Sequence, residues 1–140
     1  VAFAEEATAV DQTSDGRWLS AETPQALENA LNQLADLTPN GGSNLHAAFG
    51  AIENLDPLPD NVFLITDGLP TQGVRPAKGS LVSARDRLQH FTDALTTLNL
   101  TVPINVILLP MEGDPVASPS FWRLAQITGG AFLSPARDWP

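Results

Sequence analysis

The chain has 140 residues and no cysteine, and its 16 Asp and Glu residues outnumber its 7 Lys and Arg residues, for a formal net charge of −9. The length suits one domain, and 43% hydrophobic with 16% charged residues is the composition of a globular protein. The acidic charge disfavours nucleic acid as a partner, the lack of cysteine excludes disulfides and thiolate metal sites, and no apolar run is long enough for membrane insertion.

The first half of the chain has the pattern of a strand region followed by two helices. Residues 1–10 are largely apolar and predict a strand that turns back at the Asp-Gly pair at 15–16. The Thr-Pro pair at 23–24 predicts a helix start, because a hydroxyl cap followed by proline is typical of a helix N-terminus. After a glycine-rich break, a second helix is expected to begin at Ser43 or Asn44.

The second half alternates strands with helices. Continuous apolar runs at 62–65 and 104–109 predict strands that are buried on both faces. Ser80 is expected to cap a long helix and Ser118 a short one, after which a glycine pair leads into a last short strand. The alternation predicts an α/β fold in a single domain, with a Rossmann-like, mainly parallel sheet and helices on both of its faces.

The charge is concentrated in one part of the chain. No Lys or Arg lies between Arg17 and Arg75, whereas acidic residues there are Glu22, Glu28, Asp36, Glu53, Asp56, Asp60 and Asp67. Such a run is either a solvated acidic face or the source of a field that attracts cations.

Two polar residues stand where an α/β fold binds ligands. Asp67 directly follows a predicted buried strand, and ligands of open α/β sheets bind beyond the carboxyl ends of the strands. Ser43 follows a flexible Gly-Gly turn at a helix start. Carboxylate and hydroxyl oxygens suit Mg²⁺, Mn²⁺ or Ca²⁺. From the residues alone, the simpler explanation is that Ser43 is a helix cap and Asp67 a turn former.

Other chemistries have little support in the sequence. It contains no phosphate-binding loop, dinucleotide fingerprint or nucleophile elbow, and its two histidines are isolated. On the predicted long helix, Asp86 and Asp93 lie near Arg85 and Arg87, which predicts ion pairs between them.

Four segments, taken in order, resemble the von Willebrand factor type A domain. Residues 39–52 (PNGGSNLHAAFGAI) resemble its GGTxLxxAL segment, and residues 61–71 (NVFLITDGLPT) resemble its strand ending in TDGxPT. Residues 103–109 and 124–132 are similar to its last two strands with the LAxxTGGxF helix. Residues 1–10 are similar to its second strand, so the resemblance covers essentially the whole chain.

The resemblance implies a metal-ion-dependent adhesion site. In the family this site combines a DxSxS loop after the central strand with a Thr and an Asp, whose positions Ser43 and Asp67 occupy here. No DxSxS occurs in these 140 residues. We therefore expect an N-terminally truncated domain whose central strand and first helix lie upstream of Val1, and a partial site that binds Mg²⁺ or another divalent cation weakly.

The missing strand has a structural consequence. In the family it lies between the strands that correspond to residues 1–10 and 62–66. Without it, these two strands must pair directly or leave an open edge.

The function implied by the resemblance is a non-enzymatic binding module for a protein partner, with the cation bridging to an acidic residue of that partner. The C-terminal segments 110–115 and 128–140 resemble a bacterial subgroup, which implies a cell-envelope location and an upstream anchor. One alternative is a structural or assembly component of an envelope complex without a working metal site. Another is a metal-dependent hydrolase that uses Asp67, although no paired acid, base or nucleophile completes such a mechanism.

Overall fold

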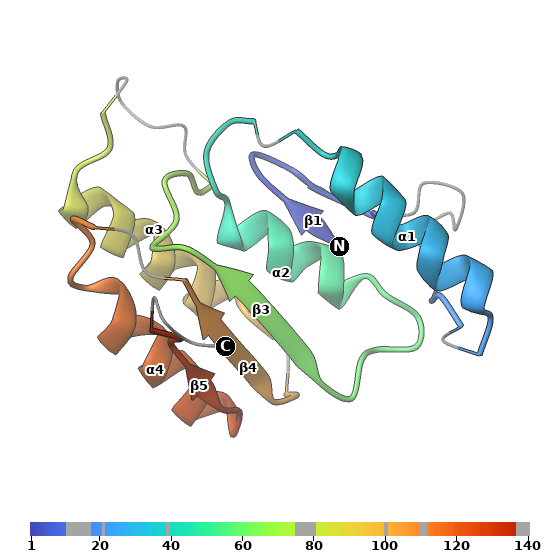
Figure 1. The fold of residues 1–140 in the computed structure, drawn as a ribbon. Coiled ribbons are helices and arrows are strands. Elements are labelled where there is room, and N and C mark those ends of the chain that lie inside the picture. Colours follow the sequence, from blue (N-terminus) through green and yellow to red (C-terminus); the bar gives the residue numbers. More distant parts are fainter. Residues whose placement is uncertain are drawn as a thin grey trace.

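A computed structural model of the chain describes residues 1–10, 18–20, 22–38, 40–74, 81–99, 101–109 and 112–136. The elements in chain order are β1 (Ala2–Phe3), β2 (Ala7–Thr8), α1 (Pro24–Asp36), α2 (Leu45–Glu53), β3 (Val62–Thr66), α3 (Ala84–Thr97), β4 (Ile104–Leu108), α4 (Ala117–Thr128) and β5 (Phe132–Leu133). They confirm the predicted α/β class (Figure 1). Within these ranges, no helix has the length and apolar character needed to cross a membrane.

The main sheet is parallel, as predicted. Its strand order is β3-β4-β5, with Val62 opposite Ile104 and Val106 opposite Phe132. Strands β1 and β2 form a separate antiparallel pair. The turn between them falls at residues 4–6, earlier than expected, and the Asp-Gly pair at 15–16 lies outside the described residues.

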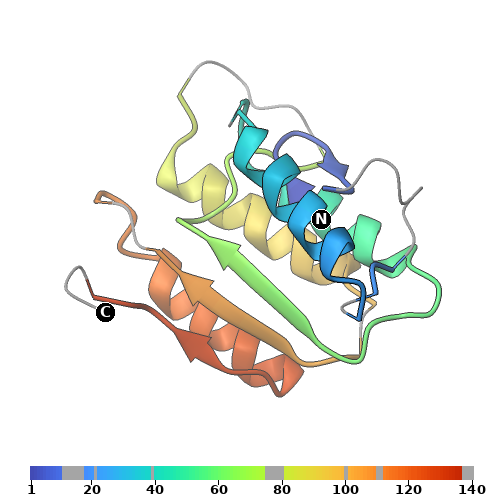
Figure 2. The same ribbon diagram turned by 45° about the vertical axis from the view of Figure 1, so that its right-hand side comes forward.

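Helices cover one face of the main sheet. On that face Val62 and Leu64 of β3 and the alternate residues of β4 are buried together with side chains of α2, α3 and α4. Helices α3 and α4 lie beside each other (Figures 1 and 2). The rings of Phe91 and Phe121 meet edge to face between them, with their centroids 5.1 Å apart. This face holds the core that fixes β3 and the loop after it.

The other face of the sheet is open, which corrects the prediction of helices on both faces. Successive side chains of a strand point to opposite faces, and Phe63 and Ile65 are 67% and 59% exposed. Helix α1, the remaining helix of the described ranges, has no buried residue. The apolar run at 62–65 is therefore buried on one face, not on both as expected.

Several helix ends differ from the predictions by a few residues. Helix α1 begins at Pro24 after Thr23, as predicted. Helix α3 is capped by Ser83, which accepts a hydrogen bond from the backbone N–H of Asp86, whereas Ser80 lies outside the described residues. Helix α4 begins at Ala117 and not at Ser118.

A groove of about 540 Å³ lies between β1 and β3. Apolar residues line it, among them Phe3, Phe49, Leu34 and the β3 residues 62–65. In the described part of the chain β1 pairs with β2 alone and β3 with β4 alone. Strand β3 therefore does not pair directly with β1, and its edge towards β1 is left open.

Hydrogen bonds show which backbone groups face this groove. The N–H of Val62 bonds to the carbonyl of Pro103, and the carbonyl of Thr66 accepts from Leu109, so these residues turn their polar groups towards β4. Because a strand alternates, the N–H and C=O groups of Phe63 and Ile65 point the other way, into the open edge.

Candidate functional site

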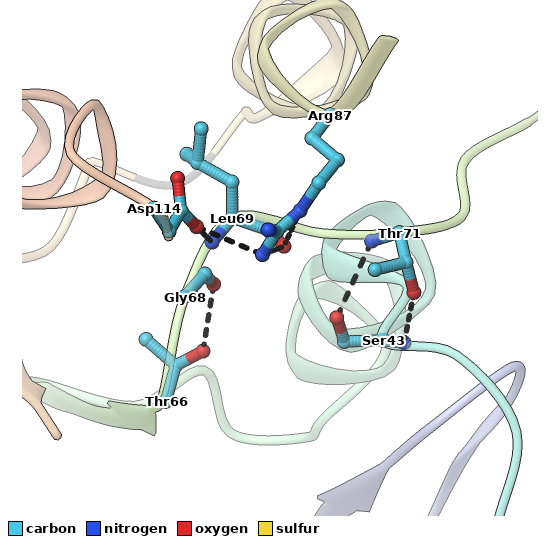
Figure 3. Close-up of polar contacts among 7 residues, drawn as sticks. All are labelled: Ser43, Thr66, Gly68, Leu69, Thr71, Arg87 and Asp114. Carbon is cyan, nitrogen blue, oxygen red and sulfur yellow. Dashed lines mark hydrogen bonds and ion pairs between the residues drawn. The ribbon is translucent and has the colours of Figure 1, made fainter. Parts of the chain in front are cut away.

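Asp67 lies at the carboxyl end of β3, directly after its last residue. Its side chain is exposed, and across the described residues no hydrogen bond or ion pair engages its carboxylate. The turn is instead held by the hydroxyl of Thr66, which donates to the carbonyl of Gly68 at 3.2 Å (Figure 3). Asp67 thus lies in the turn after β3, as predicted, but its carboxylate does not hold that turn and is available to a ligand.

Ser43 precedes α2 but does not cap it. The cap is Asn44, whose side chain accepts a hydrogen bond from the backbone N–H of Ala47 at 3.2 Å. The interpretation of Ser43 as a helix cap is therefore wrong, because the next residue has that role. Its hydroxyl accepts only a long hydrogen bond of 3.4 Å from the N–H of Thr71, which leaves it able to bind something else.

Ser43 is joined to the loop that carries Asp67. Its N–H donates to the hydroxyl of Thr71 at 3.0 Å (Figure 3). Its carbonyl accepts from the N–H groups of Thr71 and Gln72, each at 3.0 Å. Ser43 thus contacts Thr71 and Gln72, which follow Asp67 by four and five positions at the same edge of the sheet.

Gly42 permits this close approach of the two loops. A Cβ atom at Gly42 would collide with the hydroxyl of Thr71 and would lie 2.9 Å from Cγ of Gln72. Its neighbour Gly41 has a φ of 77°, in the left-handed region that favours glycine. The Gly-Gly pair that the sequence marked as flexible is therefore needed for both conformation and contact.

The turn between β1 and β2 completes this corner of the molecule. The backbone N–H of Asn44 donates to the carbonyl of Ala4 at 2.8 Å, and its side-chain amide donates to the carbonyl of Glu5 at 3.1 Å. The carboxylate of Glu5 accepts a hydrogen bond of 2.9 Å from the amide of Gln72. Three segments distant in sequence therefore meet beside Ser43.

The loop after β3 is held on its other side by an ion pair. Arg87 of α3 and Asp114, in the loop before α4, pair at 2.8 Å, and both bond to the backbone of Leu69 (Figure 3). This corrects the predicted ion pairs on α3: Asp86 accepts from the Ser83 hydroxyl and Asp93 from the Gln89 amide.

The sequence interpretation missed several residues of this arrangement. Thr71, Gln72 and Glu5 contact Ser43 or its neighbours, and Arg87 with Asp114 fixes the loop. Thr71 falls within a motif quoted for the family resemblance, which is the only signal that could have drawn attention to it. The others have no local pattern, because their partners are far away in sequence.

The donor set fits a divalent cation in part. Asp67 offers an exposed carboxylate and Ser43 a hydroxyl, both of them hard oxygen ligands. The positive charge of Arg87, which is bonded to the loop after β3, is compensated by its ion pair with Asp114. It therefore does not by itself prevent a cation from binding nearby. No group of three or more Asp, Glu, His or Cys side chains placed to hold a metal occurs among the residues that the structure describes.

Comparisons with known proteins give no family for the chain. No protein-family model, no curated protein and no solved structure matches it. The von Willebrand A resemblance therefore stays a prediction that rests on the four sequence segments.

Proposed function

We propose that the chain is a non-enzymatic binding module of the von Willebrand A type, in which a divalent cation near Asp67 and Ser43 helps to recognise a protein partner. One observation carries the proposal: the carboxylate of Asp67 is exposed and without a partner in the described residues, on a loop bonded to Ser43. Its place at the carboxyl end of β3 distinguishes Asp67 from the other exposed carboxylates of the described residues, because ligands of open α/β sheets bind there.

The charge distribution supports a cation at this place. The segment from 18 to 74, which contains α1, α2 and β3 and the loops between them, has seven acidic residues and no Lys or Arg. The acidic balance of this segment favours cations over anions as ligands, but its members at the other end of β3, such as Asp60, lie beyond the screening length of about 8 Å and add little near Asp67. A bound cation would also let this acidic surface accept a carboxylate of the partner, which the protein alone would repel.

The groove between β1 and β3 supports the resemblance independently of the metal. In the family a central strand lies between the strands that correspond to these two. The groove lies at that place and is bordered by the unpaired polar groups of Phe63 and Ile65. A strand there would join the two sheets into one.

Ser43 and Asp67 supply two oxygens, so most of an octahedral shell would remain water. We therefore expect weak binding, with a dissociation constant of roughly 10⁻⁴ to 10⁻³ M, the weak end of protein sites for such cations. Ser43 and Asp67 would bind and orient the cation, and we assign them no catalytic step.

Calorimetric titration of Mn²⁺ into the wild type, Asp67→Ala and Asp60→Ala tests the proposal. Asp60 is a matched control, because it is exposed and lies before β3, at the opposite end of the same strand. Asp67→Ala should weaken binding by about tenfold or more, since a charged ligand is lost, and Asp60→Ala should leave it unchanged. Equal affinity of all three proteins would remove Asp67 from the site.

The assembly alternative predicts a different result. If the module serves as a structural component only, the wild type will bind no Mn²⁺, and a chelator will change neither its unfolding temperature nor the capture of its partner.

A further inference from the structure

The peptide group of Leu69 is held from both sides by charged side chains. Its N–H donates to Oδ2 of Asp114 at 2.8 Å, and its carbonyl accepts from Nη2 and Nε of Arg87 at 2.6 and 3.1 Å. The two side chains pair with each other through the same atoms, Nη2 and Oδ2, at 2.8 Å (Figure 3). Both polar groups of one backbone residue are thus satisfied by one ion pair.

Each member of the pair is anchored in a different element. Arg87 is in the second turn of α3, where its N–H bonds to the carbonyl of Ser83. Asp114 lies just before α4, and its carbonyl accepts from Ala117 in the first turn of that helix. The pair therefore ties the loop after β3 to the beginnings of two helices.

The ion pair is largely buried, and it also satisfies the backbone of Leu69. The side chains of Arg87 and Asp114 are 15% and 4% exposed, and a buried ion pair can usually be replaced by apolar residues without loss of stability. Apolar residues, however, would leave the N–H and C=O of Leu69 without partners. What the pair supplies in particular is a fixed position for this backbone.

The pair lies directly against the residue after Asp67. A Cβ atom at Gly68 would be 2.8 Å from Nη2 of Arg87 and from Oδ2 of Asp114. On the other side of Asp67, the carbonyl of Thr66 is bonded to the N–H of Leu109 at 2.8 Å. The backbone at Asp67 is thus enclosed between the sheet and the ion pair.

We infer that Arg87 and Asp114 are positioning residues for Asp67: they hold the loop so that its carboxylate keeps one place relative to Ser43. The inference rests on the proposed function for the role of Asp67, but the rigidity of Asp67 can be measured without any cation. We propose neither Arg87 nor Asp114 as a ligand, because each is already bonded to the backbone of Leu69 and to the other. Both act through Leu69 and Gly68.

The test compares Arg87→Lys with Phe91→Leu, a control that disturbs the core on the same helix but removes no hydrogen bond or ion pair to the loop. Lysine keeps the charge but cannot make the two-point contact with the Leu69 carbonyl. Two quantities are measured on each protein: the NMR order parameter of the Asp67 amide without metal, and the dissociation constant for Mn²⁺.

We expect the order parameter of Asp67 to fall from roughly 0.85 to below about 0.6 in Arg87→Lys and to stay high in Phe91→Leu. The affinity for Mn²⁺ should fall about three- to tenfold in Arg87→Lys only. An unchanged order parameter, or an equal fall in both variants, overturns the inference. If the wild type binds no Mn²⁺, the proposed function fails, and the order parameter alone then decides whether the pair positions Asp67.

Discussion

The backbone N–H of Ser43 donates to the hydroxyl of Thr71 at 3.0 Å, and the N–H of Thr71 donates back to the carbonyl of Ser43 at the same distance. This reciprocal contact joins the loop before α2 to the loop after β3. The two residues are 28 positions apart. The contact brings the hydroxyl and the carboxylate of the candidate site to one edge of the molecule, although they are carried by different segments.

Removal of the Thr71 hydroxyl should loosen this connection. In Thr71→Val the N–H of Ser43, which is partly buried, loses its acceptor, and we expect the free energy of unfolding to fall by about 1–2 kcal/mol in urea denaturation. Thr92→Val is the control, because Thr92 is exposed on α3 and its change should stay within about 0.5 kcal/mol. Equal losses in the two variants would contradict the role of Thr71.

Substitutions at the adjacent residues Ser43 and Asn44 should affect cation binding and protein stability separately. Asn44→Ala removes the cap of α2 and should cost about 1 kcal/mol of stability without changing Mn²⁺ affinity. Ser43→Ala should cost less than about 0.5 kcal/mol, because the N–H of Thr71 still bonds to the Ser43 carbonyl. It should nevertheless weaken Mn²⁺ binding by about threefold or more, because the cation loses one oxygen ligand and gains a water in its place. The reverse pattern would exclude the Ser43 hydroxyl as a ligand.

Because one face of the sheet is open, the same substitution should have very different effects on stability at two neighbouring positions of β3. Leu64 is 6% exposed and Ile65 is 59% exposed, so Leu64→Thr should lower the free energy of unfolding by about 2–4 kcal/mol and Ile65→Thr by less than about 1. Threonine suits a strand, which keeps the backbone preference constant. Similar losses at both positions would mean that something covers the second face in solution.

A hydrogen bond at the N-terminus of α3 should make the stability of the protein depend on pH in the acidic range. The hydrogen bond from the Ser83 hydroxyl to Oδ2 of Asp86, at 2.6 Å, lowers the pKa of that carboxyl below its ordinary value. A lowered pKa contributes stability above the unfolded-state value, and this contribution is lost as the pH falls through the folded value. In an NMR titration, Ser83→Ala should raise the pKa of Asp86, and Arg85→Gln should raise it less. An Arg85→Gln shift as large as the Ser83→Ala shift would contradict the assigned cause.

The features predicted correctly from the sequence are those with a local signal. The apolar run of β3, the Thr-Pro start of α1 and the glycine that ends α4 each depend on neighbouring residues. The exposed face of β3 was not predicted, because an apolar run does not show what packs on it. Arg87 was assigned to neighbours on its own helix, whereas its partner Asp114 lies before the next helix and is reached only through the fold.

In the candidate site, too, some features could be predicted from a local signal and others depend on contacts between distant segments. Ser43 and Asp67 were found from their place after a glycine pair and a strand, and the family resemblance added their pairing. Their contacts could not be predicted from the sequence: a cap at Asn44 and a turn held by Thr66 leave both side chains available. The availability of these two groups is what the structure adds to the proposal.

The most direct test of the central claim is the broadening of backbone amide signals by Mn²⁺ at a concentration well below that of the protein. We predict selective loss of the signals of Asp67, Gly68 and Ser43, which persists in Asp60→Ala and disappears in Asp67→Ala. Broadening that is spread over the acidic residues of the surface, or that remains in Asp67→Ala, would contradict a cation site at the end of β3.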